Sequence, residues 1–205
     1  MLLFQDKELN IMSMVIGVCK TDFCLLVSDT RLVNYTSSGI VVQSDDFPKI
    51  ARVNDRVLIG TTGTYTQLAG IFDPLTILPS PDTADVVTVV QGVHEYMNKN
   101  RHLYTGLMRN YIICGLDRDG RHHIFGVHLD PQTLRVDTNE YDTVAFMPPL
   151  GLGDRTGFYD DKIQSIAMSD LPPEEIAHQL GDVIYLIANE NKTVNSKPIA
   201  QLIKF

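Results

Sequence analysis

The order of strand-like and helix-like segments limits the possible folds of this chain more than any other feature. The first sixty residues consist of short apolar runs separated by polar turns, a pattern that is typical of β-strands. Two helical segments, further strands, two more helices and a final strand follow. Helix pairs that alternate with sheet segments indicate a sheet sandwich with helices on its outer faces. The sequence therefore predicts an α+β fold.

The strands are predicted from the apolar runs and from the turns between them. Residues 14–19 and 23–27 are apolar runs joined by a short polar turn, which predicts a β-hairpin with both faces covered. Residues 34–38 are expected to form a polar loop, and residues 61–64 a turn of small residues. The other expected strands are 39–43, 47–53, 55–61, 111–116, 122–129, 142–146 and 198–203.

Four helices are predicted. Residues 83–98 carry apolar side chains at spacings of three and four, which place them on one stripe. The segment 171–175 contains two prolines and two glutamates, which favour a helix N-terminus, and an apolar stripe follows it. The other two helices are expected at 65–75 and 156–168.

Composition and charge exclude several classes of partner. The chain has 205 residues, of which 44% are hydrophobic, enough for one sizeable core and therefore one domain. The formal charge is −8 and no run of Lys or Arg occurs, which disfavours nucleic acid, because phosphate binding needs a basic surface. No apolar stretch reaches the roughly 18 residues of a membrane span, and the N-terminus lacks the basic start of a signal peptide. We expect no membrane partner and a cytoplasmic location.

The cysteines argue against a metal site. Cys19, Cys24 and Cys114 are odd in number, and two of them lie within apolar runs, which indicates buried free thiols in a reducing compartment. Their spacing does not fit zinc, and no second Cys/His pair completes a site. We therefore expect no metal.

Several residues with chemical potential lie at ordered spacings. Ser13 is followed four residues later by Gly17 and sixteen residues later by Asp29. Asp29 lies in the sequence Ser-Asp-Thr-Arg at the end of a predicted strand, and Lys49 lies in another, the strand expected at 47–53. A turn rich in glycine and threonine comes next, at residues 60–63.

This series of motifs resembles the proteasome β-type subunits, which are N-terminal-nucleophile (Ntn) hydrolases and include proteasome-like peptidases of bacteria. The resemblance extends to Cys-Gly-Leu-Asp at 114–117 and Gly-Leu-Gly at 151–153, and it covers nearly the whole chain. It implies a four-layer αββα sandwich of two antiparallel sheets flanked by helix pairs, formed by a single domain over residues 13–205. Residues 1–12 would be a propeptide or an upstream extension.

The resemblance also implies an assembly and a substrate class. Members of the family assemble so that their active sites face an enclosed chamber, so the chain would be one subunit of a homo-oligomeric ring. Its substrates would be unfolded proteins or peptides. The reaction would be acyl transfer to the nucleophile and then to water, with no cofactor.

The resemblance gives roles to individual residues. Ser13 would be the nucleophile, and its own α-amino group, which titrates at about pH 7.7–8.0, would accept the hydroxyl proton. Lys49 would lower the pKa of that hydroxyl, and Asp29 would hold the lysine.

Two further parts of the active site are expected from the family. Backbone N–H groups around Gly60, Thr61 and Gly63 would form the oxyanion hole. Asn189 would help to orient the α-amine.

Departures from the family pattern keep two other hypotheses open. The nucleophile is Ser instead of Thr and follows Met12 instead of Gly, so self-cleavage after Met12, or translation that starts there, would have to free it. Asn189 stands where the family has Asp, and Leu152 stands where it has Ser. The alternative is a catalytically inactive structural subunit of the same fold. A third hypothesis is an amidohydrolase that acts on a small molecule.

Overall fold

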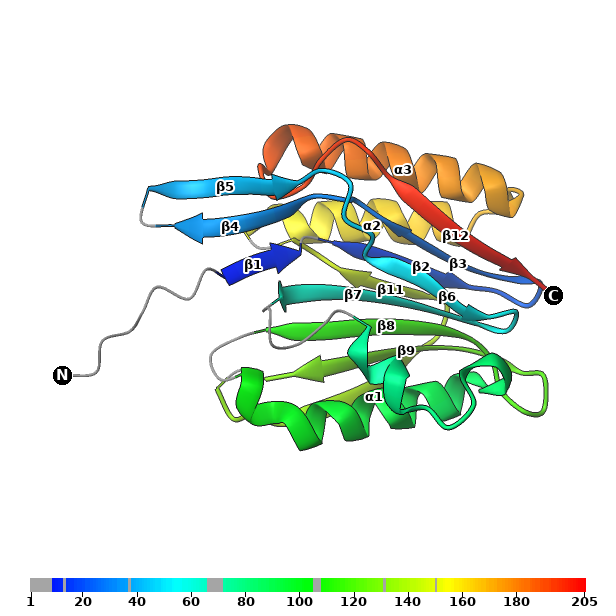
Figure 1. The fold of residues 1–205 in the computed structure, drawn as a ribbon. Helices are drawn as coiled ribbons and strands as arrows, with labels where there is room; N and C mark the ends of the chain where they lie inside the picture. The colour runs from blue at the N-terminus through cyan, green and yellow to red at the C-terminus, as the bar shows by residue number, and fades with distance from the viewer. Residues whose placement is uncertain are drawn as a thin grey trace.

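The computed structural model of the chain describes residues 9–12, 14–36, 38–65, 72–104, 108–130, 132–149 and 151–205. Within these ranges the protein is a mixed α+β structure with two antiparallel sheets (Figure 1). The α+β class predicted from the sequence is therefore confirmed. Residues 1–8 and Ser13 lie outside the described residues.

The smaller sheet has the strand order β11-β2-β3-β12. Its strands are β2 (Val15–Cys19), β3 (Phe23–Ser28), β11 (Val144–Met147) and β12 (Ile199–Lys204). The predicted hairpin is confirmed as β2 and β3, whose turn is closed by the Lys20 amide donating to the Phe23 carbonyl at 2.9 Å. Every residue of β2 and β3 is buried, because both faces of the sheet are covered.

The larger sheet has the strand order β10-β9-β8-β7-β1-β4-β5, and β6 also pairs with β7. Its strands are β1 (Leu9–Met12), β4 (Leu32–Thr36), β5 (Gly39–Ser44), β6 (Ile50–Asn54), β7 (Val57–Tyr65), β8 (Arg109–Leu116), β9 (His122–Leu129) and β10 (Val136–Tyr141). The pairing of β8 with β9 runs the length of both strands, and residues 57–63 of β7 pair with residues 109–115 of β8, in both cases without an irregularity in register.

The helices lie on the two outer sides of the sheets (Figure 1). They are α1 (Val86–Asn100), α2 (Arg155–Ala167) and α3 (Pro173–Glu190), with short 3₁₀ helices η1 (Asp73–Ile77), η2 (Pro81–Thr83) and η3 (Arg101–Tyr104). The carboxylate of Asp85 caps α1 by accepting from the Thr88 amide at 2.8 Å. Proline and two acidic residues begin α3, as the sequence predicts.

The apolar side chains form three clusters that correspond to three interfaces. One cluster lies between the two sheets and includes Val15, Leu26 and Leu58. A second joins α2 and α3 to the smaller sheet, and a third joins α1 to the larger sheet. The apolar stripes predicted on α1 and α3 supply the helix sides of the two outer clusters.

Strand β1 is a finding that the sequence pattern did not predict. Residues 9–12 pair with β4 on one side and with β7 on the other, both in antiparallel register. A segment expected to be an upstream extension therefore lies within the larger sheet. Its four residues carry no alternating pattern long enough to identify a strand, and pairing on both sides determines its conformation.

Two other local predictions, a loop and a turn, are wrong because pairing in the sheet overrides local preference. Residues 34–36 of the expected polar loop belong to β4, and residues 61–64 of the expected turn lie inside β7. Strand β10 was not predicted at all. Of the helix expected at 65–75, Tyr65 ends β7, residues 66–71 lie outside the described ranges, and the last residues fall in η1.

A search of the described residues finds no helix that is both long and apolar enough to cross a membrane.

Candidate functional site

A fully buried ion pair lies where the end of β3 meets the start of β6. Asp29 directly follows β3 and Lys49 directly precedes β6. The Lys49 ammonium nitrogen Nζ lies 2.7 Å from Asp29 Oδ1, and neither side chain is exposed to solvent. The structure thus brings together two of the three residues expected to carry the chemistry.

The Asp29 carboxylate also organises the backbone around it. Its Oδ1 accepts a second hydrogen bond from the Met14 amide at 3.2 Å, and its Oδ2 accepts one from the Arg31 amide at 2.9 Å. Both are charge-assisted bonds to a buried carboxylate. The Met14 bond matters most, because Met14 is the residue that follows Ser13.

Burial is the largest influence on the charge of Lys49 and lowers its pKa below the ordinary value for lysine. The negative charge and hydrogen bond of Asp29 oppose this shift, whereas the nearby positive charge of Arg31 adds to it. The result is a lysine with a lowered pKa that is held in place by a carboxylate.

A buried ion pair of this kind contributes little to the stability of a fold. Removing two charges from water costs several kcal/mol per ion, and well-packed apolar residues would often stabilise the same place as well or better. Buried charges with perturbed pKa values gather at functional sites. The Asp29–Lys49 pair is therefore the best candidate for a chemical centre among the described residues.

The residue that follows Ser13 contacts this centre, although Ser13 itself is outside the described residues. Met12 ends β1, and Met14 donates its amide to Asp29. Gly17 lies in β2 where the sheets approach closely, since a Cβ there would meet methyl groups of Ile112 and Ile124 at 2.8 Å. The glycine four residues after Ser13 thus has a packing reason.

The expected oxyanion residues Gly60, Thr61 and Gly63 lie in β7 and not in a turn. The Thr61 amide donates to the Lys49 carbonyl at 2.9 Å, which ties β7 to the ion pair. Gly63 has φ of +103°, and a Cβ at this position would lie 2.3 Å from the Met108 carbonyl oxygen. Only glycine tolerates this backbone. In register, Gly63 lies opposite Met12 of β1.

Strands β4 and β7 form the two sides of a slot that β1 occupies (Figure 1). Asn34 of β4 lies opposite Asn10 of β1 in the register and is 2% exposed. Its side-chain oxygen Oδ1 is buried and has no hydrogen-bond partner. A buried acceptor without a donor is uncommon in folded proteins.

The residue expected to orient the amine does not reach this centre. Asn189 is exposed near the end of α3. Two residues later, Asn191 is buried and its Oδ1 accepts from the Thr193 amide at 2.9 Å. The residue expected to replace a family serine, Leu152, is buried in the apolar cluster beneath α2 and α3.

The segment after α3 is a part of the site that sequence reasoning missed. Arg31 Nη1 donates to the carbonyls of Lys192 and Val194 at 3.1 and 3.4 Å. The Thr30 amide donates to Asn195 Oδ1 at 3.1 Å. The only signal in the sequence is the alternation of Asn, Thr and Asn at positions 191, 193 and 195, which is too short to assign a role.

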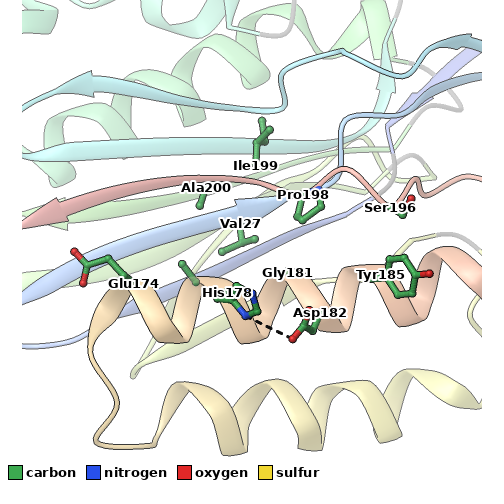
Figure 2. Close-up of a pocket in the computed structure, with 11 residues that line it drawn as sticks. Val27, Glu174, His178, Gly181, Asp182, Tyr185, Ser196, Pro198, Ile199 and Ala200 are labelled. Atoms are coloured by element: carbon green, nitrogen blue, oxygen red, sulfur yellow. Dashed lines mark ion pairs between the residues drawn. The ribbon is translucent and has the colours of Figure 1, made fainter.

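A hollow lies away from the ion pair, on the outer side of the smaller sheet, between α3 and the chain that leads into β12 (Figure 2). It encloses about 440 Å³. Figure 2 shows His178 and Asp182 facing each other across one turn of α3. The distance from His178 Nδ1 to Asp182 Oδ2 is 3.6 Å. Both side chains are mostly exposed, and none of the charged residues that line this hollow is buried. It has no centre comparable with the buried pair.

Among the described residues, no group of three or more His, Cys, Asp or Glu side chains could hold a metal ion. The three cysteines are buried and free, as the sequence predicts.

No family model and no curated protein matches this sequence. The geometry of the site is therefore the basis for a functional conclusion.

Proposed function

We propose that this protein is an N-terminal-nucleophile hydrolase of the proteasome-like type, with Ser13 as nucleophile, that cleaves peptide bonds in unfolded chains. In this proposal the two sheets and their outer helices are the four-layer αββα sandwich of that family. The protein would act as a subunit of a homo-oligomeric ring.

One observation carries the proposal: a wholly buried Lys49–Asp29 pair whose carboxylate also accepts the amide that follows Ser13. A positive charge beside the Ser13 hydroxyl would lower the pKa of that hydroxyl and favour its attack on a carbonyl carbon. Asp29 would keep the ammonium group in position, and the α-amine of Ser13 would accept the hydroxyl proton.

The backbone at Gly63 would serve the tetrahedral intermediate. Gly63 has a left-handed backbone at the position opposite the last residue of β1. This conformation turns its backbone groups away from the direction they have in a regular strand, and a backbone N–H at this position would donate to the oxyanion.

The slot between β4 and β7 would hold the substrate as an added strand. Segment 9–12 already pairs with both strands, so an extended peptide of any sequence could make the same main-chain bonds. The buried Asn34 oxygen without a partner would accept a hydrogen bond from a substrate side chain.

Segment 9–12 would be the first substrate. The Ser13 hydroxyl oxygen would attack the Met12 carbonyl carbon, and the Met12–Ser13 amide would become an ester as the nitrogen gains a proton. Water would then cleave the ester, releasing a carboxylate on Met12 and a free α-amine on Ser13. Translation starting at Met12, followed by removal of that methionine, would give the same mature chain.

The test is the intact mass of the native, untagged protein together with hydrolysis of an unstructured protein. We expect a mass that begins at Ser13 and activity that Ser13→Ala abolishes. Ser38→Ala is the matched control, because Ser38 is an exposed hydroxyl at the tip of the β4–β5 hairpin, and it should retain full activity. Undiminished hydrolysis by Ser13→Ala would contradict the proposal.

The pairing of β1 on both sides also favours one alternative, a structural subunit without activity. If segment 9–12 stays attached, the nitrogen of Ser13 is an amide and is no base, and the slot remains filled. A native mass that begins at Met1, with no hydrolysis of protein or small amide substrates, would favour this alternative.

A further inference from the structure

A second polar network lies next to the buried ion pair and has Asn195 at its centre. Asn195 is 5% exposed. Its Oδ1 accepts from the Thr30 amide at 3.1 Å, and its Nδ2 donates to the Asp45 carbonyl and to Asp45 Oδ1 at 3.0 and 3.2 Å. The side-chain amide thus uses both of its ends to join two segments of the chain.

Asp45 connects this amide to Arg31. Its carboxylate accepts from Arg31 Nε at 2.7 Å and from Arg31 Nη2 at 3.3 Å, in the two-pronged geometry that gives Arg–carboxylate pairs their directionality. Arg31 also donates to the carbonyl of Lys192 at 3.1 Å.

The segments that this network joins are those that carry the ion pair. Thr30 and Arg31 directly follow Asp29, and Asp45 precedes Lys49 by four residues. Between them the Phe47 amide donates to the Thr30 carbonyl at 2.9 Å. Asn195 adds a third segment, the one that follows α3.

We propose that Asp45 and Asn195 are positioning residues that hold the Lys49 segment against Asp29 and set the charge environment of Lys49. Neither residue would touch substrate. The effect on hydrolysis rests on the proposed function, whereas the effect on Lys49 does not.

The network has an electrostatic consequence that can be measured. Arg31 lowers the pKa of Lys49, and the Asp45 carboxylate pairs with Arg31. Removing the charge of Asp45 leaves the Arg31 charge less screened, so the pKa of Lys49 should fall. Adding a negative charge at position 195 should raise it.

The experiment is an NMR titration of the lysine side chains, with Lys49 assigned as the resonance missing from Lys49→Met. We expect a lower pKa of Lys49 in Asp45→Asn and a higher one in Asn195→Asp. Asp46→Asn is the matched control, because it removes the same charge one residue away, where Asp46 contacts the exposed Lys197. It should leave the pKa of Lys49 unchanged.

Shifts of the Lys49 pKa in opposite directions in the two variants distinguish a positioning role from a loss of structure. A loosened fold would shift this pKa in the same direction in both variants. If one variant fails to fold, the other still tests the direction of the shift in the Lys49 pKa. A Lys49 titration identical to wild type in a folded variant, or equal shifts in Asp45→Asn and Asp46→Asn, would overturn the inference.

Kinetics give the second readout. In mature Asp45→Asn we expect kcat to fall by about tenfold to a hundredfold with KM unchanged, because a displaced catalytic group costs rate and no substrate contact is lost. The alkaline limb of the pH profile should move to lower pH.

If wild type hydrolyses nothing, the proposed function fails and the titration still decides the role of Asp45 and Asn195. If wild type is active and Asp45→Asn matches it at every pH, the positioning role is wrong.

Discussion

At the scale of residues, the buried Asp29 carboxylate is the point on which the site depends. It accepts hydrogen bonds from the Lys49 ammonium group and from the amides of Met14 and Arg31, so residues from three places in the chain meet at one group. Each hydrogen bond helps to hold the carboxylate in the position that the other two require. Removing one partner therefore has a cost beyond the lost bond.

A prediction at this scale concerns Lys49→Met. We expect the free energy of unfolding to fall by about 3–5 kcal/mol, because the Asp29 carboxylate is left buried beside a neutral side chain. The double variant Lys49→Met with Asp29→Asn removes that charge and should recover much of the loss. Urea unfolding measures both. A double variant as unstable as the single one would contradict this account of the cost. The proposed function adds that neither variant should hydrolyse substrate.

At the scale of elements, the end of the β8–β9 hairpin carries a histidine between two carboxylates. His123 Nε2 lies 3.1 Å from Asp117 Oδ2, and His123 Nδ1 lies 2.6 Å from Glu140 Oε1 of β10. Burial would lower the pKa of His123, but the hydrogen bonds to Glu140 and Asp117 outweigh it and raise the pKa above its ordinary value. The turn after β8, strand β9 and strand β10 are thus joined more strongly when the His123 imidazole is charged.

The sign of the resulting pH dependence follows from the raised pKa. The charged imidazole contributes its full stability below the unfolded-state pKa of about 6.5, and the contribution is lost as pH rises through the higher folded-state value. We expect the urea midpoint to fall between pH 6 and pH 8.5 in wild type and to fall less in His123→Gln. The neighbour variant His122→Gln should behave as wild type. Equal pH dependence in all three would contradict the prediction.

At the scale of the whole molecule, the layer between the two sheets contains all three thiols. Cys19 and Cys24 face each other across the β2–β3 hairpin with 2.7 Å between their sulfur atoms, and Cys114 comes from β8 of the other sheet. The hydrogen bond to Cys24 and burial raise the pKa of Cys19, and burial raises that of Cys114. Since the thiolate is the reactive form, these cysteines should be inert in the folded protein.

Thiol labelling therefore reports on global unfolding. We expect the native protein to react slowly with a thiol reagent at pH 8, and all three cysteines to become reactive together as urea unfolds the chain. Mass spectrometry of partly labelled samples should show unlabelled and triply labelled chains. Accumulation of singly labelled protein would show instead that the sheets separate locally.

The match between sequence and structure depends on how local each signal is. The β2–β3 hairpin and the stripes of α1 and α3 were predicted because their period and turn chemistry lie within a few residues. The spacing of Asp29 and Lys49 pointed to their pairing through a family resemblance, and the structure joins them at 2.7 Å. By contrast, the role expected of Asn189 rests on the resemblance alone, and the structure leaves this residue exposed.

The sequence by itself determined which segments bury an apolar face, since hydrophobic periodicity and turn residues act over short distances. Only the tertiary structure decided that segment 9–12 lies between β4 and β7, that the small residues from Gly60 to Gly63 continue a strand, and that Asn195 reaches Thr30 and Asp45. Each of these depends on a partner far away in the chain. Such pairing is settled by the hydrogen bonds and burial that the whole fold provides, which no local pattern encodes.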